Sequence, residues 1–141
     1  MSRSNYTDDC DHLVLYRQAV ERSLCGKRGQ SFLREMIAAL DAMPVKRLLA
    51  HVLVNDGECC ALGAVAQVRK LDCADVDDSD PASVGEALGV AASLAAEVAY
   101  MNDEHDYDET PEDRWIRMRA WVARQIVVEP HELAALGEAG K

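Results

Sequence analysis

The strongest helical pattern in this chain lies between Ser31 and Pro44. Its apolar residues recur every three or four positions and therefore share one face of a helix; they are Phe32, Leu33, Met36, Ile37, Leu40 and Met43. Ser31 can accept a hydrogen bond from the first amides of such a helix, and Pro44 cannot continue it. We therefore expect a helix over residues 31–43 at the centre of the core.

The composition favours a helical core over a sheet sandwich. Apolar residues make up 49% of the 141 residues but aromatic residues only 5%, so Leu, Val, Ala and Met must fill the core. A chain of this length can bury roughly two-thirds of its unfolded surface. We predict a mainly α fold, a single-domain bundle of five to six helices with a short β-hairpin. The domain is expected to span residues 1–141, with flexible ends at 1–7 and 137–141.

Capping and stop residues delimit the other predicted helices. They run from Asp8 or Asp9 to Gly26, from Cys60 to Lys70, from Asp80-Pro81 to Gly89, from about Val90 to Met101, and from Thr110-Pro111 towards Pro130, with a last turn over residues 131–136. Residues 27–29, which include Lys27 and Arg28, are expected to form a basic loop. In the helix after Thr110 we expect an arginine face opposite a core stripe. The stripe is Trp115, Met118, Val122 and Ile126, and the arginines are Arg114, Arg117 and Arg124.

A hairpin is predicted before the helix that follows Cys60. Asp56-Gly57 tolerates the positive φ angles of a two-residue turn, so we expect a strand over residues 48–54 and a second strand through Glu58-Cys59. Gly63 inside the following helix costs about 1 kcal/mol relative to alanine. A close approach by another backbone would explain this glycine.

Two short elements carry a resemblance to a known group of proteins. The first is Gly-Glu-Cys-Cys-Ala-Leu-Gly at residues 57–63, and the second is Tyr-Met-Asn-Asp at residues 100–103. Together with an amphipathic C-terminal helix, they resemble small uncharacterised proteins of bacteriophages and prophages, in which Cys-Cys-Leu-Gly precedes Met-Asn-Asp. Ala61 departs from that pattern by separating the cysteines from Leu62. The resemblance implies a phage or mobile-element origin and no assigned activity, so it supplies no catalytic residue.

The charge and the cysteines limit partners and compartment. A net charge of −10 argues against binding nucleic acid or an anionic membrane directly, because both require a cationic surface. The first residues are polar, and no apolar run approaches the ~20 residues of a membrane span. The cysteines are odd in number, which is typical of reduced thiols; they are Cys10, Cys25, Cys59, Cys60 and Cys73. We expect a cytoplasmic protein.

The adjacent cysteines are a candidate metal or catalytic site, and one acidic loop is a candidate calcium site. Cys59 and Cys60 lack further ligands at metal-binding spacing and a recognisable catalytic base, so we expect small packed residues, with no catalytic residue, metal or cofactor. Oxygen ligands at calcium-loop spacing occur at Asp75, Asp77, Ser79, Ser83 and Glu86. The glycine position of that loop is occupied by Asp80, and Pro81 fits a helix start. A solvated capping loop is the favoured interpretation.

Carboxylates are concentrated in two stretches, residues 72–80 and 103–113. If they lie together, they form a negative face that can occupy an Arg/Lys groove made for phosphates. The predicted partner-binding residues are Asp75, Asp77, Asp78, Asp80, Asp103, Glu104, Asp106, Asp108 and Glu109. The competing interpretation is two solvated loops. We expect a non-enzymatic interaction protein that binds a basic host surface, as an inhibitor of a host defence or nucleic-acid-binding protein or as a nucleic-acid mimic.

Two other function classes remain open. The first is a structural or assembly protein that forms a homodimer or larger homo-oligomer through the alanine-rich helix of residues 90–101 and the helix carrying Trp115 and Trp121. The second is a cysteine- or metal-dependent enzyme built on Cys59 and Cys60.

Overall fold

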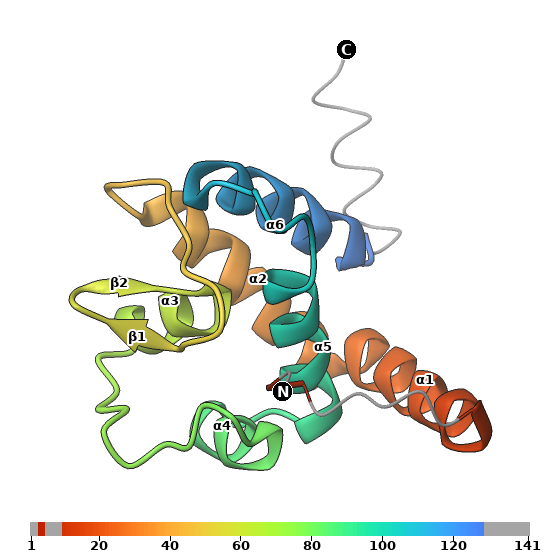
Figure 1. Cartoon of the computed structure of the whole chain (residues 1–141). Coiled ribbons are helices and arrows are strands. Elements are labelled where there is room, and N and C mark those ends of the chain that lie inside the picture. Colours follow the sequence, from red (N-terminus) through yellow and green to blue (C-terminus); the bar gives the residue numbers. More distant parts are fainter. Residues whose placement is uncertain (1–2, 5–9, 129–141) are drawn as a thin grey trace.

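The computed structural model describes residues 3–4 and 10–128, and this part of the chain is mainly helical (Figure 1). Its elements are α1 (Cys10–Cys25), α2 (Lys27–Ala42), β1 (Val54–Asn55), β2 (Glu58–Cys59), α3 (Ala61–Val68), α4 (Pro81–Leu88), α5 (Ala92–Asp103) and α6 (Pro111–Gln125). The predicted fold class, a mainly α bundle with a short β-hairpin, is confirmed. The predicted turn at residues 131–136 and the tail at 137–141 lie outside the described residues.

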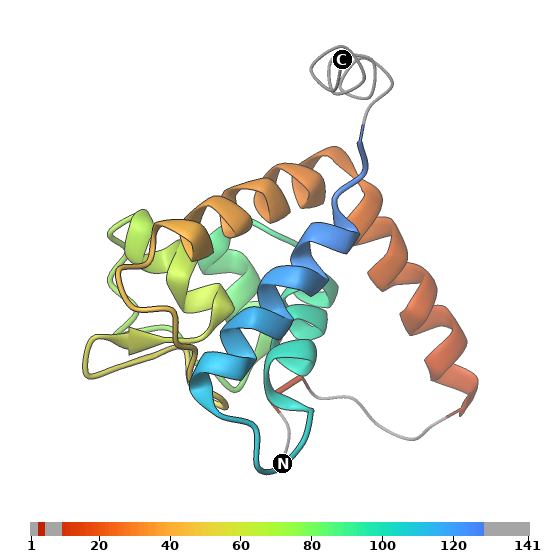
Figure 2. The same ribbon diagram turned by 90° about the horizontal axis from the view of Figure 1, so that it is seen from above.

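Helix α2 lies in the core, as its pattern predicts. Phe32, Leu33, Met36 and Leu40 are buried, and the helix packs against α1, α3 and α6. Figure 2 shows α1 and α2 diverging from the point where they join, and α6 packs against α2. The apolar stripe of α2 therefore faces the helices that follow it in the chain.

Helix α2 begins earlier than predicted. Lys27 and Arg28, expected in a loop, form its first turn. The reason is the close packing of Gly29 against α1, where an added Cβ would lie 1.8 Å from the carbonyl oxygen of Ser23. Glycine at this position lets the chain turn from one helix directly into the next, so no separate loop is needed.

The hairpin is shorter than predicted. Only Val54 pairs with Cys59 and Asn55 with Glu58, across a turn in which Asp56 and Gly57 both have positive φ. The earlier residues do not continue the strand, because His51 has a φ of 70°. The predicted two-residue turn is present, but the predicted strand over residues 48–53 is wrong.

Gly63 confirms the expected close approach of another backbone. A Cβ on this residue would lie 2.1 Å from the carbonyl oxygen of Leu53 and 2.8 Å from the Cβ of Cys59. The amide of Cys60 also donates to the Leu53 oxygen, over 3.1 Å. Helix α3 therefore sits directly on the segment that enters the hairpin.

The predicted helix starts at residues 80 and 110 are also present. The Asp80 carboxylate accepts from the amide of Ala82 over 3.1 Å, and the Thr110 hydroxyl accepts from the amide of Asp113 over 3.1 Å. Gly89 ends α4 with a φ of 73°. Helix α6 ends at Gln125, before the predicted stop at Pro130.

Within residues 3–4 and 10–128, no single helix is long and apolar enough to cross a membrane. The pair α4 and α5 passes that test only when the two are counted together, and a bend of 110° separates them.

Candidate functional site

The two elements that carry the phage-type resemblance contact each other. The buried side chain of Asn102 accepts from the amide of Ala61 over 3.2 Å and donates to the carbonyl oxygen of Leu49 over 2.8 Å. The Cys60 sulfur accepts from the amide of Gly63 over 3.5 Å and so caps the start of α3. These side chains satisfy backbone groups at a helix start and in a loop. Their roles in the described structure are therefore structural.

Asp103 does not lie on an exposed acidic face. Its carboxylate accepts two hydrogen bonds from Arg3, over 2.6 and 2.9 Å, and their side chains are only 1% and 4% exposed. It also accepts from the amide of His51 over 3.0 Å. Burial alone would raise the pKa of Asp103, but the hydrogen bonds and charge of Arg3, with smaller contributions from His51 and Asn102, hold it below its ordinary value. Asp103 is a buried structural anion.

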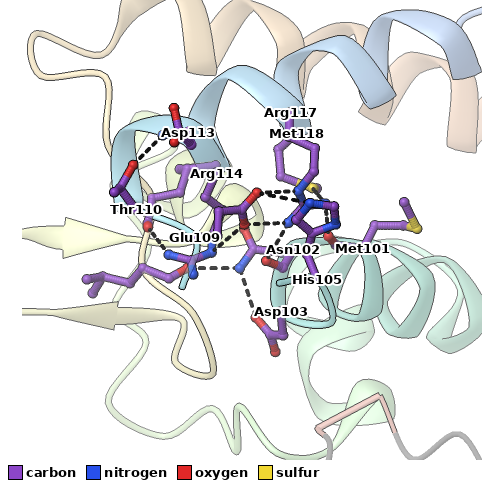
Figure 3. A network of polar contacts seen from close by, with 12 residues as sticks. Met101, Asn102, Asp103, His105, Glu109, Thr110, Asp113, Arg114, Arg117 and Met118 are labelled. Carbon is purple, nitrogen blue, oxygen red and sulfur yellow. Dashed lines mark hydrogen bonds and ion pairs between the residues drawn. The ribbon is translucent and has the colours of Figure 1, made fainter. Parts of the chain in front are cut away.

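Glu109 is also engaged by this chain's own arginines (Figure 3). Arg117 donates to it over 2.6 and 2.9 Å, Arg114 lies 3.4 Å away, and the Glu109 side chain is 6% exposed. The hydrogen bonds of Arg117 outweigh the opposing effect of burial and hold the pKa of Glu109 below its ordinary value. Arg117 also donates to the carbonyl oxygens of Met101 and Asn102 at the end of α5.

These contacts correct two predictions. Asp103 and Glu109 do not belong to an exposed partner-binding surface, and Arg114 and Arg117 do not face away from the protein. Both corrections have one cause: the end of α5 and the start of α6 leave carbonyl oxygens and carboxylates inside the protein, and arginine can satisfy several of them at once.

The remaining predicted residues keep charge at the surface, and we call them the acidic surface. They are Asp75, Asp77, Asp78, Asp80, Glu104, Asp106 and Asp108. Asp77 accepts from the amide and hydroxyl of Ser79, which holds its pKa below the ordinary value, and Asp80 caps α4. In the described part of the chain, no ion pair involves Asp75, Glu104, Asp106 or Asp108, and all four are exposed.

The two acidic stretches are anchored on the same segment of the chain. The Asp78 carboxylate accepts from the amide of Leu53 over 3.1 Å, and Asp103 accepts from the amide of His51. Amides two residues apart are separated by at most roughly 7 Å. Asp78 and Asp103 therefore bind the same short backbone segment, and the two stretches lie close together there. Figure 1 shows that their outer parts diverge: residues 71–80 lead from α3 to α4, and residues 104–110 lead from α5 to α6.

The contacts in the first stretch are those of a capping loop. The Ser83 hydroxyl accepts from the amide of Asp77 over 3.1 Å, and Asp77 binds Ser79, so three calcium-loop candidates bond to one another. Glu86 is an exposed residue of α4. Among the described residues, no group of three or more His, Cys, Asp or Glu side chains could hold a metal ion.

The adjacent cysteines are packed in the core. Cys59 and Cys60 are 1% and 0% exposed. Burial, with the neighbouring Cys60 and Glu58, raises the pKa of the Cys59 thiol to about 12. A thiol in this state is a poor nucleophile near neutral pH.

The faces considered for dimerisation are used inside the chain. Helix α5 packs against α1, α3, α4 and α6, and its residues Ala95, Ala96 and Ala99 are buried. Trp121 is buried, and the Trp115 indole donates to the carbonyl oxygen of Leu40 over 3.1 Å. The buried alanines of α5 and Trp121 are therefore not exposed to a second copy of the chain.

Arg3, the cation that pairs with Asp103, is not predicted by the sequence pattern. It belongs to a polar stretch expected to be flexible, yet Arg3 and Ser4 are buried. Nothing in the local pattern around Arg3 indicates its partner, which lies 100 positions away. The signal that the sequence offers is Asp103 itself, a carboxylate at the end of a helix rich in alanine and other apolar residues, since such a group needs a cation if it is buried.

No protein-family model, no curated protein and no solved structure matches this chain.

Proposed function

We propose that the protein is a non-enzymatic interaction protein of phage or mobile-element type, and that its acidic surface binds a basic surface of a host protein. The proposal rests on one observation, that the acidic residues of the protein differ in exposure and in pairing with arginine. Asp103 and Glu109 are neutralised by arginines inside the chain, whereas Asp75, Glu104, Asp106 and Asp108 are exposed and pair with no cation among residues 3–4 and 10–128. The unpaired carboxylates are available to another molecule.

Unpaired carboxylates act over a longer range than paired ones. Exposed charges attract a partner over about 8 Å at physiological salt, and they steer it without a deep pocket. A row of lysines and arginines that normally holds phosphates is the complementary surface. We therefore propose that the partner is a nucleic-acid-binding protein, such as a component of host defence, and that binding inhibits it.

The phage-type origin is supported by the contact between the resembling elements. The Cys-Cys-Ala-Leu-Gly and Met-Asn-Asp elements meet through the hydrogen bond from Ala61 to Asn102. Two separated elements that depend on each other in the core are the kind of pattern that a family with this fold would share.

Affinity capture from a bacterial lysate at rising salt tests the function. We expect a nucleic-acid-binding protein to be retained at 50 mM salt and released by a few hundred millimolar, because exposed ion pairs are screened. The purified partner should then be displaced from DNA by this protein. Recovery of salt-insensitive partners alone, or of no partner, would contradict the proposal, as would a partner that binds DNA and this protein together.

A further inference from the structure

A cavity of about 240 Å³ lies beside the first acidic stretch. Its walls come from the segment before the hairpin, from α3, from residues 71–76 and from α4. The side chains that define it are Leu53, Leu71, Cys73, Val76, Val84 and Ala87. Leu71 is 39% exposed, and Ala87 is also exposed, so the cavity opens to the surface beside these two residues.

The size and lining of the cavity suit an apolar group. An apolar cavity of about 150 Å³ can hold a benzene molecule, and one water molecule needs roughly 30 Å³. The cavity is therefore large enough for an aliphatic or aromatic side chain. Its lining is mainly aliphatic, so it offers few hydrogen bonds to the several waters that would otherwise fill it.

The charge around the opening selects what can carry that side chain. Asp72 lines the cavity, and the exposed Asp75 and Asp77 follow in the same loop. Among the described residues, no lysine or arginine lines it. A segment with acidic flanks would be repelled here, whereas lysines and arginines beside the apolar side chain would meet opposite charge.

We propose that this cavity binds one aliphatic or aromatic side chain of the partner, presented by a segment rich in lysine and arginine. The inference rests on the proposed function and adds an anchor to it. The carboxylates attract the basic segment, and the buried side chain fixes where it stops. A side chain buried in a pocket near the centre of an interface, with a polar rim around it, is a common arrangement in protein complexes.

Two synthetic peptides test the anchor. Every residue except the central one is lysine or arginine in both peptides. The central residue is leucine in one peptide and alanine in the other. We expect the leucine peptide to bind about tenfold more tightly in a fluorescence anisotropy titration, because only leucine removes substantial apolar surface from water. A third peptide, with glutamate in place of the basic residues, should not bind.

A variant that fills the cavity supplies the structural control. Ala87→Leu places extra carbon at the opening of the cavity. The affinity of this variant for the leucine peptide should fall to within about twofold of its affinity for the alanine peptide. Ala82→Leu changes the same residue type on the same helix, but Ala82 does not line the cavity. This variant should keep the tenfold preference.

The outcomes separate the anchor from the proposed function. Equal binding of the leucine and alanine peptides would overturn the anchor and leave the acidic surface intact. Failure of both peptides to bind would overturn both ideas. Self-association of the protein that Ala87→Leu abolishes would make a second copy the occupant, which also overturns the anchor.

Discussion

Arg3 and Asp103 form a buried ion pair at the end of α5. Their side chains are almost completely buried, and Asp103 also holds the His51 amide and the Asn102 side chain. A buried pair of this kind need not stabilise the fold relative to apolar residues, but a single partner left alone is costly. The consequence of losing Arg3 is therefore larger than the consequence of losing both charges.

Replacing Arg3 by methionine should lower the free energy of unfolding by about 3–5 kcal/mol, because Asp103 is left buried without a cation. Arg119→Met is the matched control. Arg119 also binds a carboxylate, Asp41, at 3.0 Å, but both side chains are at least 40% exposed, so the loss should be much smaller than for Arg3→Met. Urea denaturation followed by circular dichroism measures both. Equal losses in the two variants would show that the Arg3 pair is not buried.

The same pair predicts how stability depends on pH. The pKa of Asp103 is lowered in the folded protein, so its contribution is fully present above its ordinary pKa of about 4 and is lost as the pH falls through the lowered value. Asp103→Asn removes this titration. The difference in unfolding free energy between wild type and Asp103→Asn should be constant near neutral pH and shrink below pH ~4. A difference that stays constant down to pH ~2 would contradict the lowered pKa.

Helix α3 and the hairpin form one packed unit with the end of α5. Gly63 brings α3 against Leu53, Asn102 fixes the first amide of α3, and Arg117 binds the last carbonyl oxygens of α5. Asn102 contacts α3 from 41 positions away in the sequence, and Arg117 contacts α5 from 15 and 16 positions away. A change at one contact should therefore disturb several elements.

Gly63→Ala should lower the free energy of unfolding by about 1–3 kcal/mol, because the new Cβ would overlap the Leu53 carbonyl and force the backbones apart. Gly57→Asn is the control. Gly57 lies in the hairpin turn with open space around it, and asparagine tolerates its positive φ, so the loss should stay below about 1 kcal/mol. Thermal denaturation compares them. If Gly63→Ala is as stable as the control, the close approach is absent.

Local signals predicted helix starts and turns well. These signals act on the backbone within a few residues. The helix starts at Asp80-Pro81 and Thr110-Pro111 and the turn at Asp56-Gly57 are all present in the structure. Gly63 could be predicted as a close approach because a mid-helix glycine is costly. The strand before Val54 could not be excluded locally, because its absence depends on the backbone conformation of His51.

The site was predicted less completely than the fold. Sequence alone shows that Asp103 and Asp106 are acids, but not that one meets Arg3 and the other meets no cation in the described structure. Likewise, periodicity placed Arg117 opposite the core stripe, although its long side chain reaches back to Glu109. Which charges remain free is a property of contacts between distant parts of the chain.

Across the whole molecule, internal pairing and exposed charge divide the acidic residues into two groups. The net charge of −10 is not spread evenly over free carboxylates, because arginines pair with Asp103 and Glu109 where α5 leads to α6. What is left for a partner is concentrated in the acidic surface and near the apolar cavity. The position of a carboxylate on the surface, and not the net charge alone, should therefore decide how strongly the partner binds.

Two triple variants with the same change in net charge separate position from charge. The first carries Asp75→Asn, Asp106→Asn and Asp108→Asn within the acidic surface. The second carries Glu21→Gln, Asp56→Asn and Glu86→Gln at exposed acids outside it. All six replacements keep the size of the side chain, so folding should be unchanged, which circular dichroism verifies.

The dissociation constant of the purified nucleic-acid-binding partner, measured for both triple variants between 50 and 200 mM salt, is the most direct test. We predict that the acidic-surface triple weakens binding about tenfold at low salt and flattens the salt dependence, since exposed pairs contribute about 0.2–1 kcal/mol each. The second triple should stay within about twofold of wild type. Equal weakening in both triples, or none in the first, would contradict the claim that these carboxylates form the binding surface.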